Sequence, residues 1–326
     1  MKNKGIHITI TIPSFKIVQN HKFSLLIIGL FTVIVLLSGI LVRRYLEIKQ
    51  LAFGDLPIVN IFFPSQHVIT QRITEEVLPK EGFQTKIYLG NAITKLVSYG
   101  VIDKGKIEEL YKGRGGLASW QKDMLSKSSK KPLVITQENS VWLVNILWPL
   151  GLSNKMGINN QSPIAGENVR NYASTGGWNL GKEENGGVYF NKYSIIHLSP
   201  KQEQHVKYLA DRIYRPCCNN STFFQDCNHG SAALALIELG VSQGLSDKEI
   251  YNTALAFNSF WFPQNYVETA LYLKRTKGTD WKNIDVKLVL SKQYSSISGW
   301  IANIDTLAQK IPGLLPQQAG GGSCGA

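Results

Sequence analysis

A long uncharged apolar run near the N-terminus constrains this 326-residue chain more than any other feature of its sequence. It covers residues 23–42 and reads FSLLIIGLFTVIVLLSGILV. At about 1.5 Å per residue, a helix of this length spans about 30 Å, the thickness of the hydrocarbon core of a bilayer. A cleaved signal peptide has a shorter apolar region and a small-residue cleavage site, whereas Arg43 and Arg44 follow this run. We therefore predict a single N-terminal transmembrane helix with the lipid bilayer as its partner.

The charges beside this run bear on its orientation. Four lysines precede it, and Arg43, Arg44 and Lys49 follow it, so the bias toward a cytoplasmic N-terminus is slight. An N-terminal span ahead of a long domain usually acts as a signal-anchor. We therefore predict a single-pass membrane protein whose C-terminal domain is extracytoplasmic, with a larger membrane complex as a further candidate partner.

The remaining charge gives no sign of a nucleic-acid partner. The chain has a net charge of +12, and residues 1–44 contribute six Lys/Arg and no Asp/Glu. The excess that remains is spread over some 280 residues without a run of basic and aromatic side chains. We therefore expect no nucleic-acid binding and a solvated, mildly basic surface.

The chain after the run reads as mainly α, with little β-sheet. We predict helices over residues 68–77, 91–99, 103–111, 138–152, 201–214, 231–243, 247–260, 263–275, 286–291 and 298–310, and an extended segment over 131–136. Pro149 and Gly151 are expected to end the helix over 138–152. Ser246 and Glu249 have the spacing of a capping box.

Composition then suggests the domain boundaries. We predict a cytoplasmic tail (1–22), the anchor (23–42), a juxtamembrane linker (43–56), a mixed and mainly helical region (57–198), a helical cysteine–histidine domain (199–311) and a flexible Gly-rich tail (312–326). Residues 157–187 form a Gly-rich loop within the mixed region. That loop is read as a structural loop, with a substrate-binding or cluster-covering role as the alternative.

The only concentrated chemistry lies in the segment YRPCCNNSTFFQDCNHGS, residues 214–231. It holds Cys217, Cys218, Cys227 and His229 in a loop between two predicted helices. Three thiols and an imidazole suit a soft metal, Cu or Zn, rather than Mg or Ca. Cys324, on the Gly-rich tail, is a candidate fifth ligand that could reach back to the site. We therefore predict a metal site made of these five residues.

Other readings of the cysteines remain open. The spacing is CC-x8-C-x-H, which is not the paired C-x2-C of a zinc ribbon. The thiols could form a redox-active pair, which would make the protein a thiol–disulfide oxidoreductase. They could also form a structural disulfide in a non-catalytic subunit of a membrane complex, or be inert buried cysteines. The protein is thus not assigned as an enzyme or a non-enzyme from its sequence.

Residues 217–262 resemble the thiol-bearing three-helix domain of CcmH-type cytochrome c maturation proteins. The matching pieces are Cys217-Cys218-Asn219-Asn220 and the run GLSDKEI at residues 244–250. That family has C-x-x-C, whereas this chain has adjacent cysteines. The chain is also similar to membrane-anchored Cys-motif proteins of no established activity. Both resemblances imply thiol or metal chemistry outside the cytoplasm.

Overall fold

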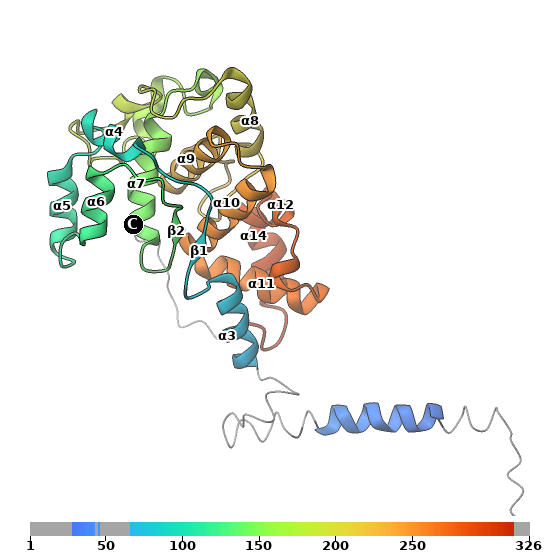
Figure 1. The fold of residues 1–326 in the computed structure, drawn as a ribbon. Helices are drawn as coiled ribbons and strands as arrows, with labels where there is room; N and C mark the ends of the chain where they lie inside the picture. The colour runs from blue at the N-terminus through green and yellow to red at the C-terminus, as the bar shows by residue number, and fades with distance from the viewer. Residues whose placement is uncertain (1–27, 43–44, 46–65, 316–326) are drawn as a thin grey trace, which may run out of the picture. The chain divides into compact units, whose positions relative to one another are not determined.

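The computed structural model of the protein describes residues 28–42, 45 and 66–315 (Figure 1). The chain divides into two compact units, Met1–Ser65 and Gln66–Ala326. In the first unit, residues 28–42 form a helix whose side chains are all exposed. The predicted tail over 1–22, nearly all of the predicted linker over 43–56, and residues 316–326 lie outside the described residues.

The predicted membrane anchor is corrected by the structure. Among the described helices, none is both long enough and apolar enough to cross a membrane. Residues 23–27 of the predicted span lie outside the described residues. The transmembrane helix over 23–42, the single-pass membrane localisation and the extracytoplasmic placement built on it are therefore contradicted.

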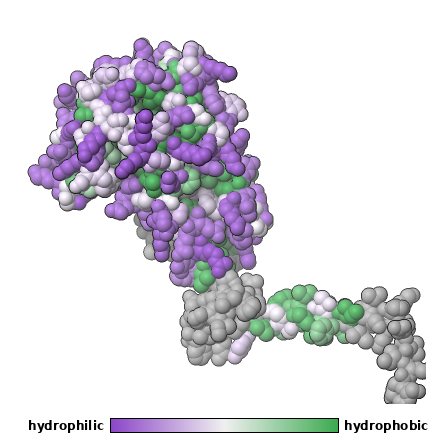
Figure 2. All heavy atoms as spheres, viewed as in Figure 1, coloured by the Kyte–Doolittle hydropathy of each residue, from purple (hydrophilic) through white to green (hydrophobic). Residues whose placement is uncertain are grey.

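The second unit is mainly helical, as predicted, and its surface in Figure 2 is largely hydrophilic. Its first half contains α3 (Gln66–Val77), α4 (Ala92–Ser98), α5 (Lys104–Lys112), α6 (Ser119–Ser126) and α7 (Ser140–Ser153), followed by the short 3-10 helices η1 (Gly157–Gln161), η2 (Glu167–Asn171) and η3 (Gly186–Tyr189). Its second half contains α8 (Pro200–Ala210), α9 (Asn228–Ser242), α10 (Asp247–Trp261), α11 (Pro263–Lys277), η4 (Trp281–Asn283), α12 (Val286–Val289), α13 (Lys292–Ser295), α14 (Ile297–Trp300), η5 (Ile301–Asp305) and α15 (Thr306–Ala308).

The strand content of the described residues is small. β1 (Phe83–Gln84) and β2 (Val134–Ile135) form one antiparallel pair, in which Phe83 faces Ile135. Two isolated bridges are also present, an antiparallel one between Gly90 and Ser129 and a parallel one between Asn154 and Tyr193. Two-residue strands cannot bury a sheet face of their own, so the core is built by helices.

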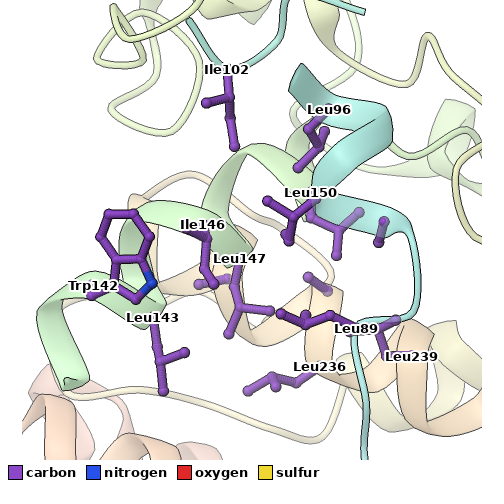
Figure 3. Close-up of a cluster of buried hydrophobic side chains, with 14 of the residues drawn as sticks. Leu89, Leu96, Ile102, Trp142, Leu143, Ile146, Leu147, Leu150, Leu236 and Leu239 are labelled. Atoms are coloured by element: carbon purple, nitrogen blue, oxygen red, sulfur yellow. The ribbon is translucent and has the colours of Figure 1, made fainter. Parts of the chain in front are cut away.

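Helix α9 lies at the centre of this unit because nearly all of its residues are buried. One set of its side chains joins the core shared with α4 and α7, which Figure 3 shows in part; this set is Ala232, Ala235, Leu236 and Leu239. Another set joins a second core shared with α8, α10 and α11; this set is Leu234, Ile237 and Val241. The two cores therefore meet along one helix, and the N-terminus of that helix is the position of Cys227.

Helix α7 crosses the start of α9 at very short range. A Cβ added at Gly151 would lie 1.9 Å from the backbone oxygen of Ser231, so only glycine fits there. The Ser231 hydroxyl lies within hydrogen-bond distance of two acceptors, the backbone oxygen of Trp148 at 3.0 Å and Gln225 Oε1 at 2.9 Å. These contacts hold the first turn of α9, and with it the cysteine segment, against α7.

Candidate metal centre

The cysteine segment folds back on the elements that precede it. Thr222 donates both its backbone N–H and its hydroxyl to the backbone oxygen of Ile213, and Phe223 N–H donates to Ala210 at the end of α8. On the other side, the backbone oxygen of Cys218 accepts from Ile297 N–H at 3.1 Å, at the start of α14. The loop is therefore closed by backbone hydrogen bonds, and its three thiols are brought to one place.

Cys217, Cys218 and Cys227 form one group of sulfur atoms. Their Sγ atoms all lie within 4.8 Å of one another, which is close enough to hold a metal ion. Cys217 Sγ is 3.5 Å from Cys227 Sγ and 3.8 Å from Cys218 Sγ. All three thiols are free and partly buried, so the structural disulfide that the sequence left open as an alternative is not formed in this structure.

Cys227 caps the N-terminus of α9. Its backbone is extended, and its Sγ accepts a hydrogen bond from Gly230 N–H at 3.3 Å. The first amides of a helix lack partners within the helix and carry partial positive charge. A sulfur at this position is therefore stabilised as the thiolate, which is the form that binds metal.

Besides the N-terminus of α9, the guanidinium of Arg215 also stabilises the Cys227 thiolate. Its side chain is fully buried, and Nε donates to Cys227 Sγ at 3.2 Å. One Nη donates to the backbone oxygen of Asn220 at 3.1 Å, and the other donates to Asp226 Oδ1 at 2.6 Å. A Cβ added at Gly230 would lie 2.4 Å from this guanidinium, so the glycine gives the arginine its room.

Asp226 makes the buried guanidinium part of a neutral pair. Its Oδ1 binds Arg215 and its Oδ2 accepts from the Asn220 amide at 2.7 Å. A buried charge is tolerated when it is paired and its other hydrogen-bonding groups are satisfied. Burial opposes the charge on Arg215, but the neighbouring cysteines, Cys227 first among them, outweigh it and raise the pKa of Arg215, so the guanidinium stays charged.

The three thiols differ in their acidity. Hydrogen bonds from Cys217 and Cys218, together with Arg215, hold the pKa of Cys227 well below its usual value, although burial opposes this. The pKa of Cys217 is raised by its hydrogen-bonding contacts with Cys218 and Cys227 and by its partial burial. The hydrogen bond from Cys217 lowers the pKa of Cys218, but interaction with Cys227 and burial outweigh it and raise that pKa to about 12. The site thus contains one thiolate and two thiols.

His229, a predicted ligand, does not join the sulfur group. Its ring packs against the rings of Phe262 at 4.6 Å and Trp261 at 5.5 Å between centroids. Burial lowers the pKa of His229 to about 4, so the imidazole is neutral near neutral pH. Its ring nitrogens are not among the atoms that lie within 4.8 Å of one another. Cys324, the fifth predicted ligand, lies outside the described residues.

The Gly-rich loop over residues 157–187 contacts the backbone of the cysteine segment. Ser174 is fully buried, its N–H donates to the backbone oxygen of Asp226 at 3.1 Å, and its hydroxyl donates to that of Gln225 at 2.5 Å. The Trp148 indole N–H in turn donates to the Ser174 backbone oxygen at 2.6 Å. These contacts place Ser174 beside the residues that precede Cys227, and a cluster-covering role for the loop stays a prediction.

Three residues that support the thiols are not among the predicted ligands: Arg215, Asn220 and Asp226. Their positions in the sequence could have indicated this role. Arg215 lies two residues before Cys217 and Asp226 lies directly before Cys227, and charged residues beside cysteines can control thiolate formation. No protein-family model matches the chain, and no similar curated protein or solved structure was found for it. The resemblance to CcmH-type proteins therefore stays a prediction.

Proposed function

We propose that this protein binds a soft metal ion, Cu or Zn, through the sulfurs of Cys217, Cys218 and Cys227. The observation that carries the proposal is the convergence of three free thiols within 4.8 Å. In the described part of the chain, this is the one group of three or more Cys, His, Asp or Glu side chains found so close together. Thiolate donors select soft or borderline ions over Mg and Ca.

The surroundings support ligand binding over simple packing. Cys227 is held as a thiolate by the start of α9 and by Arg215, so one ligand is already in its binding form. The backbone around the site is fixed by hydrogen bonds to α8, α14 and the Gly-rich loop. A fixed site loses little conformational entropy when an ion binds.

The test is elemental analysis of the reduced, full-length protein beside a count of free thiols. We expect about one Cu or Zn per chain, and we expect Cys227→Ser to reduce the bound metal at least ten-fold, because it removes the ionised ligand. Cys324→Ser is the matched control, since it removes a thiol without changing the three sulfurs; an equal loss of metal in this variant would instead identify Cys324 as a ligand. Metal-free wild-type protein after reconstitution would contradict the proposal.

A second candidate function is thiol–disulfide exchange, and one observation favours it. The Cys227 sulfur, whose pKa is lowered, lies 3.5 Å from Cys217 Sγ. Oxidation would join these sulfurs and pass two electrons and two protons to a small disulfide, which becomes two thiols. Mass spectrometry after incubation with oxidised glutathione tests this function: a reversible Cys217–Cys227 bond supports it, and three unmodified thiols count against it.

A role in a larger complex stays a prediction. That expectation depended on the apolar helix over residues 138–152 as an interface. In the structure this segment is α7, and its apolar side chains, apart from the half-exposed Val141, lie largely within the protein's own core. The site, and not this helix, therefore carries the functional proposal.

A further inference from the structure

The sulfur separations give the shape of the site. With a metal–sulfur bond of about 2.3 Å, the separations of 3.5 Å and 3.8 Å correspond to S–M–S angles of about 99° and 111°. Both angles are below those of a flat, symmetric three-coordinate ion and close to those of a pyramidal or tetrahedral one. The two contacts of Cys217 are therefore compatible with an ion that lies above the plane of the three sulfurs, as the apex of a pyramid.

The fourth position of such a pyramid has no acid or imidazole donor among the described residues within 4.8 Å of the three sulfurs. Asp226 has both carboxylate oxygens engaged, by Arg215 and by Asn220. The His229 ring is packed against Trp261 and Phe262. A tetrahedral ion bound here would need its fourth ligand from outside this set.

Charge balance narrows the choice of ion. The buried Arg215–Asp226 pair is neutral as a whole, so the ion and the three sulfurs alone decide the charge of the loaded site. Three thiolates with Cu(I) carry two negative charges, and three thiolates with Zn(II) carry one. Three thiolates on a trivalent ion carry none, and burying uncompensated charge costs free energy.

On the basis of the proposed thiol site, we infer that Cys217, Cys218 and Cys227 bind trivalent arsenic, or the chemically similar trivalent antimony, as a neutral pyramidal three-sulfur adduct. Arsenous acid is an uncharged As(OH)3 molecule near neutral pH. Each As–O bond is replaced by an As–S bond; two leaving hydroxides take the protons of Cys217 and Cys218, the third takes a proton from solvent, and all three depart as water. The balance is As(OH)3 + 2 RSH + RS⁻ + H⁺ → As(SR)3 + 3 H2O, with arsenic trivalent throughout and no electrons transferred.

The experiment titrates reduced, full-length protein with sodium arsenite. We expect three free thiols to be lost per arsenic bound, and arsenic K-edge absorption fine structure to show three sulfur neighbours and no oxygen. In Cys227→Ser, and in Cys218→Ser, which leaves the cap of α9 intact, we expect two sulfur neighbours and an affinity at least ten-fold weaker. In Cys324→Ser we expect three sulfur neighbours and the wild-type affinity.

The outcomes separate this inference from the proposed function. Two or fewer sulfur neighbours in the wild type, or a sulfur lost in Cys324→Ser, would overturn the inference. If Cu(I) or Zn(II) binds at the three cysteines while arsenite does not, the inference fails and the proposed function stands. If neither the ions nor arsenite bind there, both fail.

Discussion

At the scale of single residues, Arg215 favours the ionised form of Cys227 in the thiol site. It is fully buried, it donates to Cys227 Sγ, and Asp226 neutralises it. Removing one member of a buried ion pair leaves the other member without its partner, which costs more than the pair contributes. The arginine therefore links the stability of the loop to the ionisation of Cys227.

For Arg215→Met we expect unfolding free energy to fall by about 3–5 kcal/mol, because Asp226 loses its partner. The pKa of Cys227 should rise, since the guanidinium that stabilises the thiolate is gone. Denaturant unfolding measures the first effect, and the pH dependence of alkylation by iodoacetamide measures the second. Arg212→Met, at an exposed arginine that stacks on Tyr208 outside the site, is the matched control.

A double variant separates the two effects. Arg215→Met with Asp226→Asn removes the unpaired carboxylate, so part of the lost stability should return while the pKa of Cys227 stays raised. An alkylation profile equal to that of the wild type in either variant would show that Arg215 does not control the thiolate.

The sequence predicted the cysteines of the site but not its charged support. Three cysteines in eleven positions are visible as a local pattern, and they do converge. Arg215 and Asp226 are eleven positions apart, and each resembles an ordinary surface charge. Their burial depends on α9 and on Gly230, which a local pattern does not reveal. For the same reason, the sequence did not reveal that the His229 ring packs against Trp261 and Phe262 at the end of α10.

At the scale of elements, the crossing of α7 and α9 positions the site. The sequence predicted a helix over 138–152 ended by Pro149 and Gly151; α7 ends within one residue of that bound, at Ser153, and contains both residues. Ser153 Oγ donates to the Pro149 backbone oxygen at 2.6 Å, and Gly151 fits against Ser231. Tertiary packing on α9 thus outweighs the local helix-breaking tendency of both residues.

For Gly151→Ala we expect destabilisation by about 1–3 kcal/mol, because a methyl group cannot fit between α7 and the Ser231 carbonyl without a shift of backbone. Thermal and urea unfolding measure this loss. Gly113→Ala is the matched control: its φ is −68° and its added Cβ meets open space. A loss of the same size in both variants would contradict the role assigned to the crossing.

Other elements show where local signals suffice. The capping box at Ser246 and Glu249 was predicted and is present at the start of α10. Helix α6 was not predicted, because its N-cap is Ala118, which has no capping side chain. There the Gln121 side chain accepts from Ala118 N–H at 2.8 Å instead. The predicted helix over 298–310 is divided among α14, η5 and α15.

At the scale of the whole molecule, one buried carboxyl couples stability to pH. Glu238 lies in α9 between the two cores, is fully buried, and neither of its oxygens has a hydrogen-bond partner. Burial raises the pKa of Glu238 well above its usual value; the nearby Asn154 amide lowers it by less. The folded protein therefore keeps this carboxyl protonated at a pH where the unfolded chain has released the proton.

The sign of this coupling follows from the raised pKa. The protonated carboxyl supports the folded state fully below the unfolded pKa of about 4.3, and that support declines as pH rises toward the folded pKa. We expect Glu238→Gln, which cannot ionise, to unfold at a higher temperature than the wild type at pH 8, with the difference shrinking toward pH 4. Glu108→Gln, at an exposed position on α5, is the control. A difference that does not change with pH would contradict this account.

The position of Cys227 as the cap of α9 has a thermodynamic consequence. Because α9 joins both cores, a ligand held by Cys227 is linked to the folding of the unit as a whole, not only to the loop that surrounds it. At a hundred times its dissociation constant, a ligand that binds only the folded state adds about 2.7 kcal/mol to stability. Ligand binding at the thiol site and the stability of the folded unit therefore rise together. The amount of folded protein in a cell would then depend on how much ligand is available.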